Sequence, residues 1–252
     1  MNQPITGFRL DEVDDWVAVL ACGHGQHVRH EPPLTFRPWI LTPAGRQAKI
    51  GWMLNCVRCD RGELPTEKPM QSIETLTTER LTAERFRPDH YDLLCRLHRD
   101  PVVMATLGGV RSDETTRQNL QDYIAHWETH GFGLWLLRDR ASGEFAGRAG
   151  LKGIEIGGHW EIEVGYTFLQ PYWGRGLATE IGAATLEVGF ERLGLEELVC
   201  FTLPTNLASK RVMEKVGFVF EREVMHMGEA TILHRLTRGE YRQGRGDQPT
   251  DR

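Results

Sequence analysis

The sequence predicts a mixed α+β protein in which helices flank a mostly antiparallel sheet, and a small β-rich Cys/His domain precedes that sheet. Three strand-like runs follow one another at residues 132–139, 143–153 and 159–169, with turn residues between them. Strands joined by short turns pair antiparallel. A helix, a strand and a second helix follow over residues 174–215, and this passage requires at least one parallel pair. Three of the five cysteines lie in the first quarter of the chain, which indicates the separate first domain.

Caps, breakers and periodicity delimit the individual elements. A strand over residues 80–87 leads into a short helix with Pro88 in its first turn, and a longer helix begins after the cap Ser112 and ends at Gly131. The elements expected after the meander are a helix at 174–192, a strand at 198–203, a helix at 205–215 and two closing strands. Four apolar residues of the first of these helices share one face toward the sheet: Leu177, Ile181, Ala184 and Val188.

Composition and charge are those of an ordinary globular protein. The chain has 252 residues, of which 40% are apolar and 26% charged, so it can bury the core of one or two domains. The formal net charge of -5 provides no overall attraction to nucleic acid or to an anionic membrane. No run approaches the roughly 20 apolar residues that span a bilayer, and the opening residues lack the layout of a secretory signal. We therefore expect a cytoplasmic protein without a membrane partner, and nucleic acid is disfavoured as a partner.

A segment without apolar periodicity divides the chain into two units. Residues 61–72 contain two prolines and are typical of a linker. The expected parts are a Cys/His domain at 1–62, a linker at 63–72, a larger domain at 73–240 and a flexible tail at 241–252. The sequence leaves the oligomeric state open between a monomer and a homodimer.

The segment QPYWGRGLATE follows a predicted strand and opens a predicted helix. Gly174, Gly176 and Ala178 let an anion approach unpaired amides at the positive end of the helix dipole, which predicts a phosphate site. Two alternatives remain open. The glycines could serve only the turn, or the segment could bind a dinucleotide, although it lacks the final Gly or Ala of that fingerprint and follows a strand of alternating polarity.

Two motifs together resemble those of the GNAT superfamily of N-acetyltransferases. EVGYTFLQPYWGRGLATE and TLPTNLASKRVMEKVGF stand in the order of that family, and they are similar to the branch that includes ribosomal-protein N-terminal acetyltransferases. The similarity covers about residues 73–240. It implies a twisted, mostly antiparallel sheet that splays between two central strands. It also implies direct transfer of an acetyl group from acetyl-CoA to an amine, either a protein N-terminus or a small molecule, in a ternary complex.

The resemblance also implies where acetyl-CoA binds. Backbone groups of Phe168 and Leu169 would meet the pantetheine arm, and the amides from Gly174 to Thr179 would hold the pyrophosphate. Trp173 stands where many members of the family have Gln or Arg. The residues expected to bind the cosubstrate are Phe168, Leu169, Trp173, Gly174, Arg175, Gly176, Leu177, Ala178, Thr179 and Asn206.

Acetyl transfer to an amine requires a base for the amine and a proton for the departing thiolate. Glu161 and Glu163 share one face of a predicted strand, so Glu163 is the expected base, acting through water, unless both glutamates are simply solvated. Many GNAT enzymes have a tyrosine as the acid where this sequence has Met213. Ser209, which the resemblance places beside the thioester together with Asn206, is the nearest substitute.

Other reactive side chains are expected to have ordinary roles. Cys200 lies in an apolar strand with no histidine near it in the sequence, which disfavours an acyl-cysteine route. Four histidines fall on predicted polar helix faces, where we expect them to be solvated: His90, His98, His126 and His130.

The first quarter of the chain carries a pattern that predicts a structural zinc site. A C-x-x-C turn supplies Cys56 and Cys59, while Cys22 with His24 or His27 supplies the remaining ligands. Reduced surface thiols with solvated histidines, or a redox pair, are the alternatives. The CGH, QHVRH, PP, RPW and CVRC elements resemble a small bacterial domain family of unknown function.

A second hypothesis treats the chain as a CoA-sensing module without catalysis, whose first domain binds RNA or protein. Basic residues together with Trp39 and Trp52 could form such a surface, although no recognised RNA-binding motif accompanies them. Turnover of acetyl-CoA with amines would separate the enzyme from the sensor.

Overall fold

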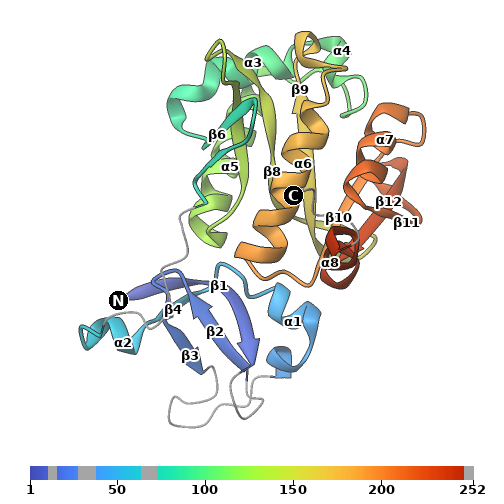
Figure 1. Ribbon diagram of the computed structural model, residues 1–252. Helices are drawn as coiled ribbons and strands as arrows, with labels where there is room; N and C mark the ends of the chain where they lie inside the picture. Colours follow the sequence, from blue (N-terminus) through green and yellow to red (C-terminus); the bar gives the residue numbers. More distant parts are fainter. Residues whose placement is uncertain (11–15, 28–37, 64–72, 247–252) are drawn as a thin grey trace, which may run out of the picture.

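A computed structural model describes residues 1–10, 16–27, 38–63 and 73–246. They form a four-stranded sheet from the start of the chain and an eight-stranded sheet from the rest, one above the other in Figure 1. The predicted linker falls on residues 64–72, outside the described ranges, except for its first residue. Within the described part of the chain, no helix is long and apolar enough to cross a membrane.

The eight-stranded sheet has the order β11-β12-β10-β9-β8-β7-β6-β5. Every neighbouring pair is antiparallel except β9 with β10, which is parallel. Its strands are β5 (Thr75–Thr77), β6 (Leu81–Arg85), β7 (Leu134–Asp139), β8 (Phe145–Ile156), β9 (His159–Phe168), β10 (Glu197–Thr202), β11 (Val219–His226) and β12 (Glu229–Thr237). The predicted α+β class with a mostly antiparallel sheet is confirmed, while the short strand β5 was not predicted.

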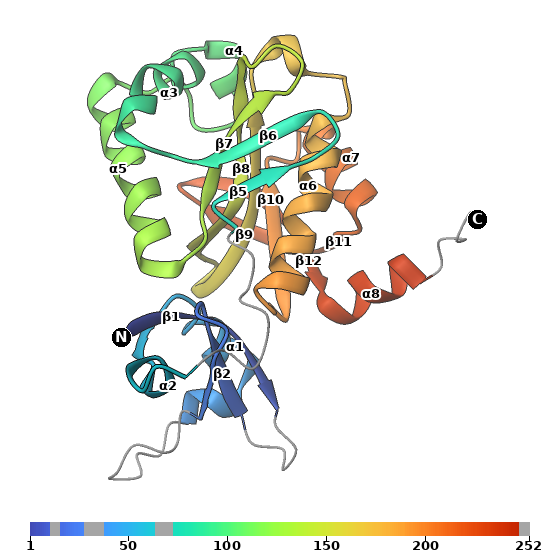
Figure 2. The same cartoon turned by 60° about the vertical axis from the view of Figure 1, so that its left-hand side comes forward.

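Helices cover both faces of this sheet: Figure 2 shows α3 and α5 over one face and α6 over the other. The helices are η2 (Pro88–His90), α3 (Tyr91–His98), α4 (Pro101–Met104), α5 (Asp113–His130), η3 (Gln170–Tyr172), α6 (Leu177–Glu187), α7 (Leu207–Val216) and α8 (Arg238–Gly246). α5 has the predicted limits, because the Ser112 side chain accepts a hydrogen bond from the Thr115 N–H and Gly131 ends the helix with φ 72°.

α6 begins later than the sequence predicts. Gly174 and Gly176 have φ of 70° and 77°, a conformation that helix residues do not adopt, so the first helical residue is Leu177. The helix continues as a π-helical turn, Val188–Arg192. Leu177 and Val188 are buried toward the sheet as predicted, whereas Ala184 is half-buried.

A helix stands at the C-terminal end, where a flexible tail was predicted from residue 241. α8 runs through Tyr241, whose side chain is 9% exposed and whose ring centroid lies 4.8 Å from that of Phe190. This aromatic contact anchors α8 against the last turn after α6, a contact across fifty residues that local sequence could not indicate. The rest of the predicted tail, 247–252, lies outside the described residues.

The small sheet has the order β3-β2-β1-β4, and all its pairs are antiparallel. Its elements are β1 (Asn2–Leu10), β2 (Trp16–Leu20), β3 (Gly25–His27), η1 (Pro38–Leu41), α1 (Pro43–Gln47), β4 (Met53–Asn55) and α2 (Val57–Asp60). The predicted β-rich character of this region is confirmed.

The two sheets share one continuous core. Ile5 and Ile40 of the small sheet's region belong to the same buried cluster as Trp127 of α5. The backbones also approach closely, because a Cβ atom added at Gly51 would lie 2.0 Å from the Cα atom of His130. The small sheet is therefore packed against the C-terminal end of α5.

Candidate functional site

The single parallel pair of the large sheet is joined at one register position, where Val199 of β10 meets Glu163 of β9. Beyond it, β9 runs on to Phe168 beside β8, and β10 runs on to Thr202 beside β12. No further register pair joins β9 to β10 within the described residues. The backbone groups on the facing edges therefore lack strand partners there, and an extended ligand with amide groups could bind to them.

The turn after β9 leads into the first turn of α6. Gly174, Arg175 and Gly176 are exposed, and no atom lies within 4 Å of a Cβ position built at Gly174. The N–H groups that begin α6 at Leu177 have no intrahelical carbonyl partner. Together with the helix dipole, they form an anion-binding position at the end of the gap between β9 and β10.

Arg80, just before β6, fixes the conformation of this turn. Its Nη1 donates to the Arg175 carbonyl at 2.7 Å, and its Nε donates to Glu180 Oε2 at 2.7 Å. Glu180 Oε1 also accepts from the Arg80 N–H at 2.8 Å and from the Thr78 hydroxyl at 2.5 Å. These contacts join positions about a hundred residues apart, so no local sequence pattern indicates them.

Part of the predicted pantetheine-binding backbone is already engaged. The Leu169 N–H donates to the Ala146 carbonyl at 2.9 Å, which removes it as a donor to a ligand. The Phe168 carbonyl accepts from the Trp173 indole at 2.7 Å and keeps its second lone pair. Trp173 thus ties the turn back to β9, which explains why a tryptophan can stand at this position.

A hydroxyl pair lies between β9 and α7. The Tyr166 hydroxyl donates to the Ser209 carbonyl at 3.2 Å and lies 3.0 Å from the Ser209 Oγ atom. Asn206 caps α7, because its Oδ1 accepts from the Ser209 N–H at 3.1 Å. Burial raises the pKa of Tyr166, so its hydroxyl stays protonated. Met213 is fully buried in the core.

Cys200 has the ordinary role expected of it. Its side chain is 3% exposed, and burial, followed by the nearby Glu163 charge, raises the pKa of the thiol. A thiol held in its neutral form is a poor nucleophile.

Glu163 lies half-buried on β9, opposite Lys152 of β8. Burial raises the pKa of its carboxyl group and outweighs the opposing charges of Lys152 and Arg148. Glu161 differs, because it is 8% exposed and its Oε1 accepts from Arg235 Nη2 at 2.7 Å. The alternative in which both glutamates are solvated is therefore wrong. Of the two, Glu163 is the one that forms no ion pair with any described residue.

The predicted solvation of the helix histidines is wrong. His90 and His98 are 3% and 1% exposed, and His126 and His130 are half-buried. His126 Nδ1 lies 2.8 Å from the Phe132 carbonyl oxygen and Nε2 accepts from the Gly153 N–H at 2.9 Å, which fixes one neutral tautomer. Burial lowers the pKa of His126 to about 4. Helical periodicity failed here because α3 and α5 contact the rest of the protein through polar as well as apolar side chains.

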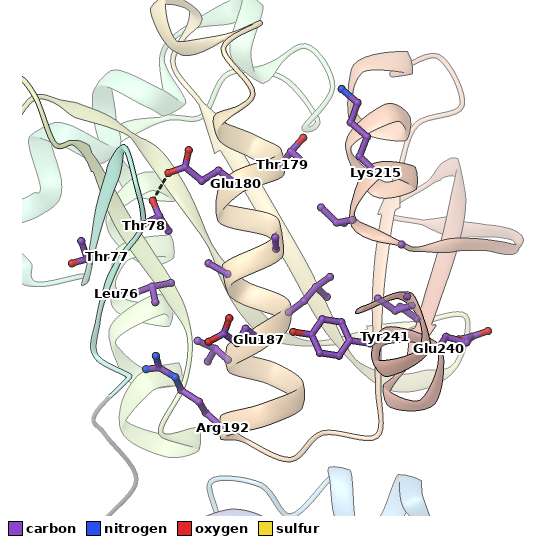
Figure 3. A pocket seen from close by; sticks show the side chains of 18 residues that line it. Leu76, Thr77, Thr78, Thr179, Glu180, Glu187, Arg192, Lys215, Glu240 and Tyr241 are labelled. Carbon is purple, nitrogen blue, oxygen red and sulfur yellow. Dashed lines mark hydrogen bonds between the residues drawn. The ribbon is translucent and has the colours of Figure 1, made fainter. Parts of the chain in front are cut away.

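A cavity of about 720 Å³ lies along the outer side of α6, between β5, α7 and α8 (Figure 3). Thr179 and Lys215 lie at its upper end in that view, and Arg192 and Tyr241 lie lower. Thr179 is the one lining residue that was predicted to bind acetyl-CoA, and neither Glu163 nor Ser209 lines this cavity. It therefore lies outside the predicted centre of chemistry.

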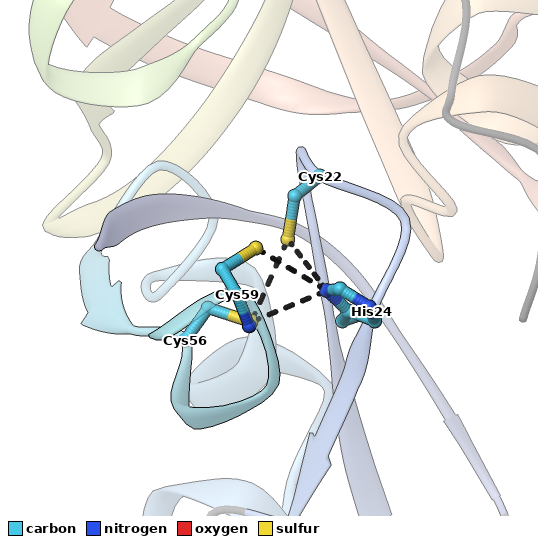
Figure 4. A group of neighbouring side chains, drawn as sticks. All are labelled: Cys22, His24, Cys56 and Cys59. Carbon is cyan, nitrogen blue, oxygen red and sulfur yellow. Dashed lines mark hydrogen bonds between the residues drawn. The ribbon is translucent and has the colours of Figure 1, made fainter. Parts of the chain in front are cut away.

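A second cluster of reactive side chains lies at the edge of the small sheet (Figure 4). The ligand atoms of Cys22, His24, Cys56 and Cys59 all lie within 4.8 Å of one another. His24 Nδ1 is 3.5, 3.4 and 3.3 Å from the three sulfur atoms, and the Cys22 and Cys56 sulfur atoms are 3.7 Å apart. The turn between β2 and β3 carries the first pair of ligands and the start of α2 carries the second, and β1 brings them together by pairing with both β2 and β4. His27 is not a member of this group.

Comparison with known families assigns the larger part of the chain. A family model described as an acetyltransferase (GNAT) domain matches residues 80–219. The chain belongs to the GNAT family of acetyltransferases. A second model, DUF3565, described as a protein of unknown function, matches residues 6–63, which contain the Cys/His group.

Individual relatives of this GNAT acetyltransferase agree with the family model. It is 31% identical over 136 residues to an uncharacterized protein, YkkB, of Bacillus subtilis, a match of 54% of this chain and 79% of the relative. It is 29% identical to the FsC-acetyl coenzyme A-N(2)-transacetylase of Aspergillus fumigatus, over 66% of this chain and 77% of that one. The acetyltransferase of Agrobacterium tumefaciens has a TM-score of 0.58 and 27% identity, covering 68% of this chain and 98% of its own.

A ribosomal-protein-S5-alanine acetyltransferase of Vibrio fischeri shares the fold of this GNAT chain. Its TM-score is 0.55 at 18% identity, over 66% of this chain and 98% of that one. At this identity the likeness concerns the fold alone. The sequence resemblance to the GNAT superfamily is confirmed, and the neighbours include ribosomal-protein acetyltransferases as expected.

Proposed function

We propose that this GNAT protein transfers the acetyl group of acetyl-CoA directly to an amine bound in the same complex. The observation that carries the proposal is the parting of β9 and β10 after Glu163, which ends at the exposed glycine turn before α6. An extended pantetheine amide chain suits the unpaired strand edges, and a pyrophosphate suits the amides from Gly174 to Thr179.

In the proposed reaction, the amine nitrogen attacks the thioester carbonyl carbon. A carbon–nitrogen bond forms while the carbon–sulfur bond breaks. Glu163 accepts the proton that the amine loses, through a water molecule, and its raised pKa suits a base that works near neutral pH. The hydroxyl pair of Ser209 and Tyr166 donates a hydrogen bond to the departing thiolate, which takes its proton from water, while Asn206 holds Ser209 by capping α7.

A turnover assay tests this function. Purified protein is mixed with acetyl-CoA and a panel of amines, and release of free CoA thiol is followed for wild type and for Glu163→Gln. We expect the variant to lose about a hundredfold or more of kcat/KM, the usual effect of a general base, while acetyl-CoA affinity measured by calorimetry stays the same. Glu155→Gln, which changes an exposed glutamate on the neighbouring strand β8, is the matched control and should have no effect.

Two outcomes contradict the proposal. Absence of acetyl-CoA binding by the intact protein would remove the assigned cosubstrate. Tight acetyl-CoA binding without thiol release in any amine mixture would instead favour the CoA-sensing hypothesis.

We also propose that Cys22, His24, Cys56 and Cys59 hold one structural zinc ion. Tetrahedral zinc with Zn–S of about 2.3 Å and Zn–N of about 2.0 Å separates two sulfur ligands by roughly 3.8 Å and a sulfur from a nitrogen by roughly 3.5 Å. The distance of 3.7 Å between the Cys22 and Cys56 sulfur atoms and the sulfur–nitrogen distances of 3.3 to 3.5 Å fit these separations. Four protein ligands leave no open position, which is typical of a structural site.

Metal content of the purified protein tests the zinc proposal. Wild type should contain close to one zinc ion per chain by elemental analysis. His24→Ala should lose most of it, while His27→Ala, the matched control at the other histidine of the sequence pattern, should keep it. Zinc-free wild type, or equal loss in both variants, would contradict the assignment.

A further inference from the structure

Three unpartnered polar atoms belong to side chains on the side of the large sheet that α3 and α5 cover. Among the described residues, six buried side-chain nitrogen or oxygen atoms have no hydrogen-bond partner, and three of them are His98 Nε2, Arg111 Nε and Arg148 Nε. The two arginine Nε–H groups are donors, and His98 Nε2 is a third donor in the tautomer whose Nδ1 accepts from the Thr116 hydroxyl. Unpartnered buried donors are costly, so these groups indicate a missing acceptor.

An effect on the pKa of His98 and two contacts indicate that these three side chains lie near one another. The charges of Arg148 and Arg111 contribute, after burial, to lowering the pKa of His98 to about 3. The Arg111 N–H donates to the His98 carbonyl at 3.1 Å, and the Arg148 guanidinium lies 5.5 Å from the ring centre of Tyr123 on α5. His98 Nδ1 is 3.1 Å from the Thr116 hydroxyl oxygen, which leaves Nε2 as the atom without a partner.

The charges around this position have one sign. Within the described ranges, no carboxylate lies in ion-pair distance of Arg111 or Arg148. Arg111 Nη2 donates only to the Leu107 carbonyl, at 3.2 Å. The two guanidinium groups therefore have donors available for an anion, and a guanidinium matches a carboxylate or phosphate in shape.

Arg148 lies on the same face of the β8–β9 pair as Glu163, the proposed base. Three register pairs of β8 and β9 follow one another on the same face, two residues apart. They are Arg148 with Thr167, Gly150 with Gly165, and Lys152 with Glu163. A Cβ at Gly165 would lie 3.5 Å from Glu163 Oε1, so the Glu163 carboxylate leans along β9 toward the glycine pair. Arg148 belongs to the next register pair, about 7 Å further along the strands.

From this arrangement we propose that the acceptor amine carries its own anionic group, a carboxylate or a phosphate, and that Arg148, Arg111 and His98 bind it. The inference rests on the proposed acetyl transfer and narrows the acceptor class. The amine lies over the glycine pair within reach of Glu163, and the anionic group supplies the acceptor that the three nitrogen atoms lack. A compact amino acid or amino phosphate fits this spacing, whereas a protein N-terminus fits only when a neighbouring side chain provides the anion.

Matched pairs of amines test the proposal. The assay compares β-alanine with its amide, and O-phosphoethanolamine with ethanolamine, by thiol release from acetyl-CoA. We expect kcat/KM to be at least tenfold higher for the anionic member of one pair, and the pair that shows the preference distinguishes carboxylate from phosphate. Arg148→Gln and Arg111→Gln should raise KM for the anionic amine at least tenfold relative to KM for the neutral amine, so that the preference between the two members of the pair is lost. Arg96→Gln, an exposed arginine on α3, is the control.

A binding readout separates failure of this inference from failure of the proposed function. In CoA-saturated protein, the ¹⁵N shift of the Arg148 Nε–H should move on addition of β-alanine or O-phosphoethanolamine, with no change on addition of the neutral amines. Thiol release with neutral amines at rates equal to the anionic ones, or an unmoved Nε–H shift with all four probes, would overturn the inference while acetyl-CoA binding stands. Water molecules would then be the partners of the three atoms.

Discussion

The two sheets of this protein are stabilised in different ways. The large sheet has helices on both faces and buries apolar side chains from Leu81 of β6 to Leu236 of β12. The small sheet has two strands of only three residues, and its described α-helices have five and four. A unit this small buries too little apolar surface to be stable alone. We therefore expect it to depend on the proposed zinc site and on its contact with α5, whereas the large sheet depends on packing.

Loss of the proposed zinc ligands should produce the largest effect and should separate the behaviour of the two sheets. Structural zinc contributes about 10–16 kcal/mol in small peptides, comparable to the whole stability of a domain. We expect Cys56→Ser to abolish hydrogen-exchange protection in β1 and β2 while amides in β8 and β9 remain protected. Cys95→Ser, which removes a buried thiol from α3, should leave the small sheet protected. Equal loss of protection in both sheets would show that they unfold together.

Ionisation of the Glu163 carboxyl group should lower the stability of the large sheet while it makes the residue available as a base. Burial in the folded protein raises the pKa of Glu163 and so favours the neutral carboxyl group over the carboxylate. The free energy of unfolding therefore falls as the pH rises from the ordinary pKa of Glu through the raised pKa. We expect kcat/KM to rise with pH along a limb that lies above the ordinary Glu range and is lost in Glu163→Gln. The same variant should have a higher Tm than wild type at pH 8 and an equal Tm at pH 4. A lower Tm at pH 8 would contradict the raised pKa.

The contact between the sheets can be tested at Gly51. Its φ is 83°, and an added Cβ would overlap the His130 backbone, whereas Gly62 has φ 69° with nothing within 4 Å of that position. Ala in the left-handed region costs about 1–2 kcal/mol at either site, and overpacking adds about 1–3 kcal/mol at Gly51 alone. Chemical denaturation should therefore show a greater loss of unfolding free energy for Gly51→Ala than for Gly62→Ala. Equal losses would mean that the sheets can separate at little cost.

The sequence predicted local features of both regions and missed the contacts between distant segments. Strand alternation, caps and the glycine turn predicted the β7–β9 meander and α5, and cysteine spacing predicted the members of the Cys/His group except for the choice between His24 and His27. Arg80 could not be found this way, because its partner Glu180 is a hundred residues away. Nothing local indicates that the Tyr166 hydroxyl reaches Ser209, because the two residues are 43 positions apart. The site therefore depends on pairs that only the assembled sheet brings together.

The smallest effect is expected at the hydroxyl pair, where two groups share one task. Tyr166→Phe leaves the Ser209 hydroxyl in place, and a thiolate with an ordinary thiol pKa of about 8.5 departs without full protonation. We therefore expect kcat to fall only about tenfold, less than the usual effect of losing a general acid, with KM for acetyl-CoA unchanged. The double variant with Ser209→Ala should lose more than the product of the single effects, because each hydroxyl can replace the other. Tyr241→Phe on α8 is the control for loss of a tyrosine hydroxyl. A double variant no slower than Tyr166→Phe would contradict a shared role of the two hydroxyls in stabilising the thiolate.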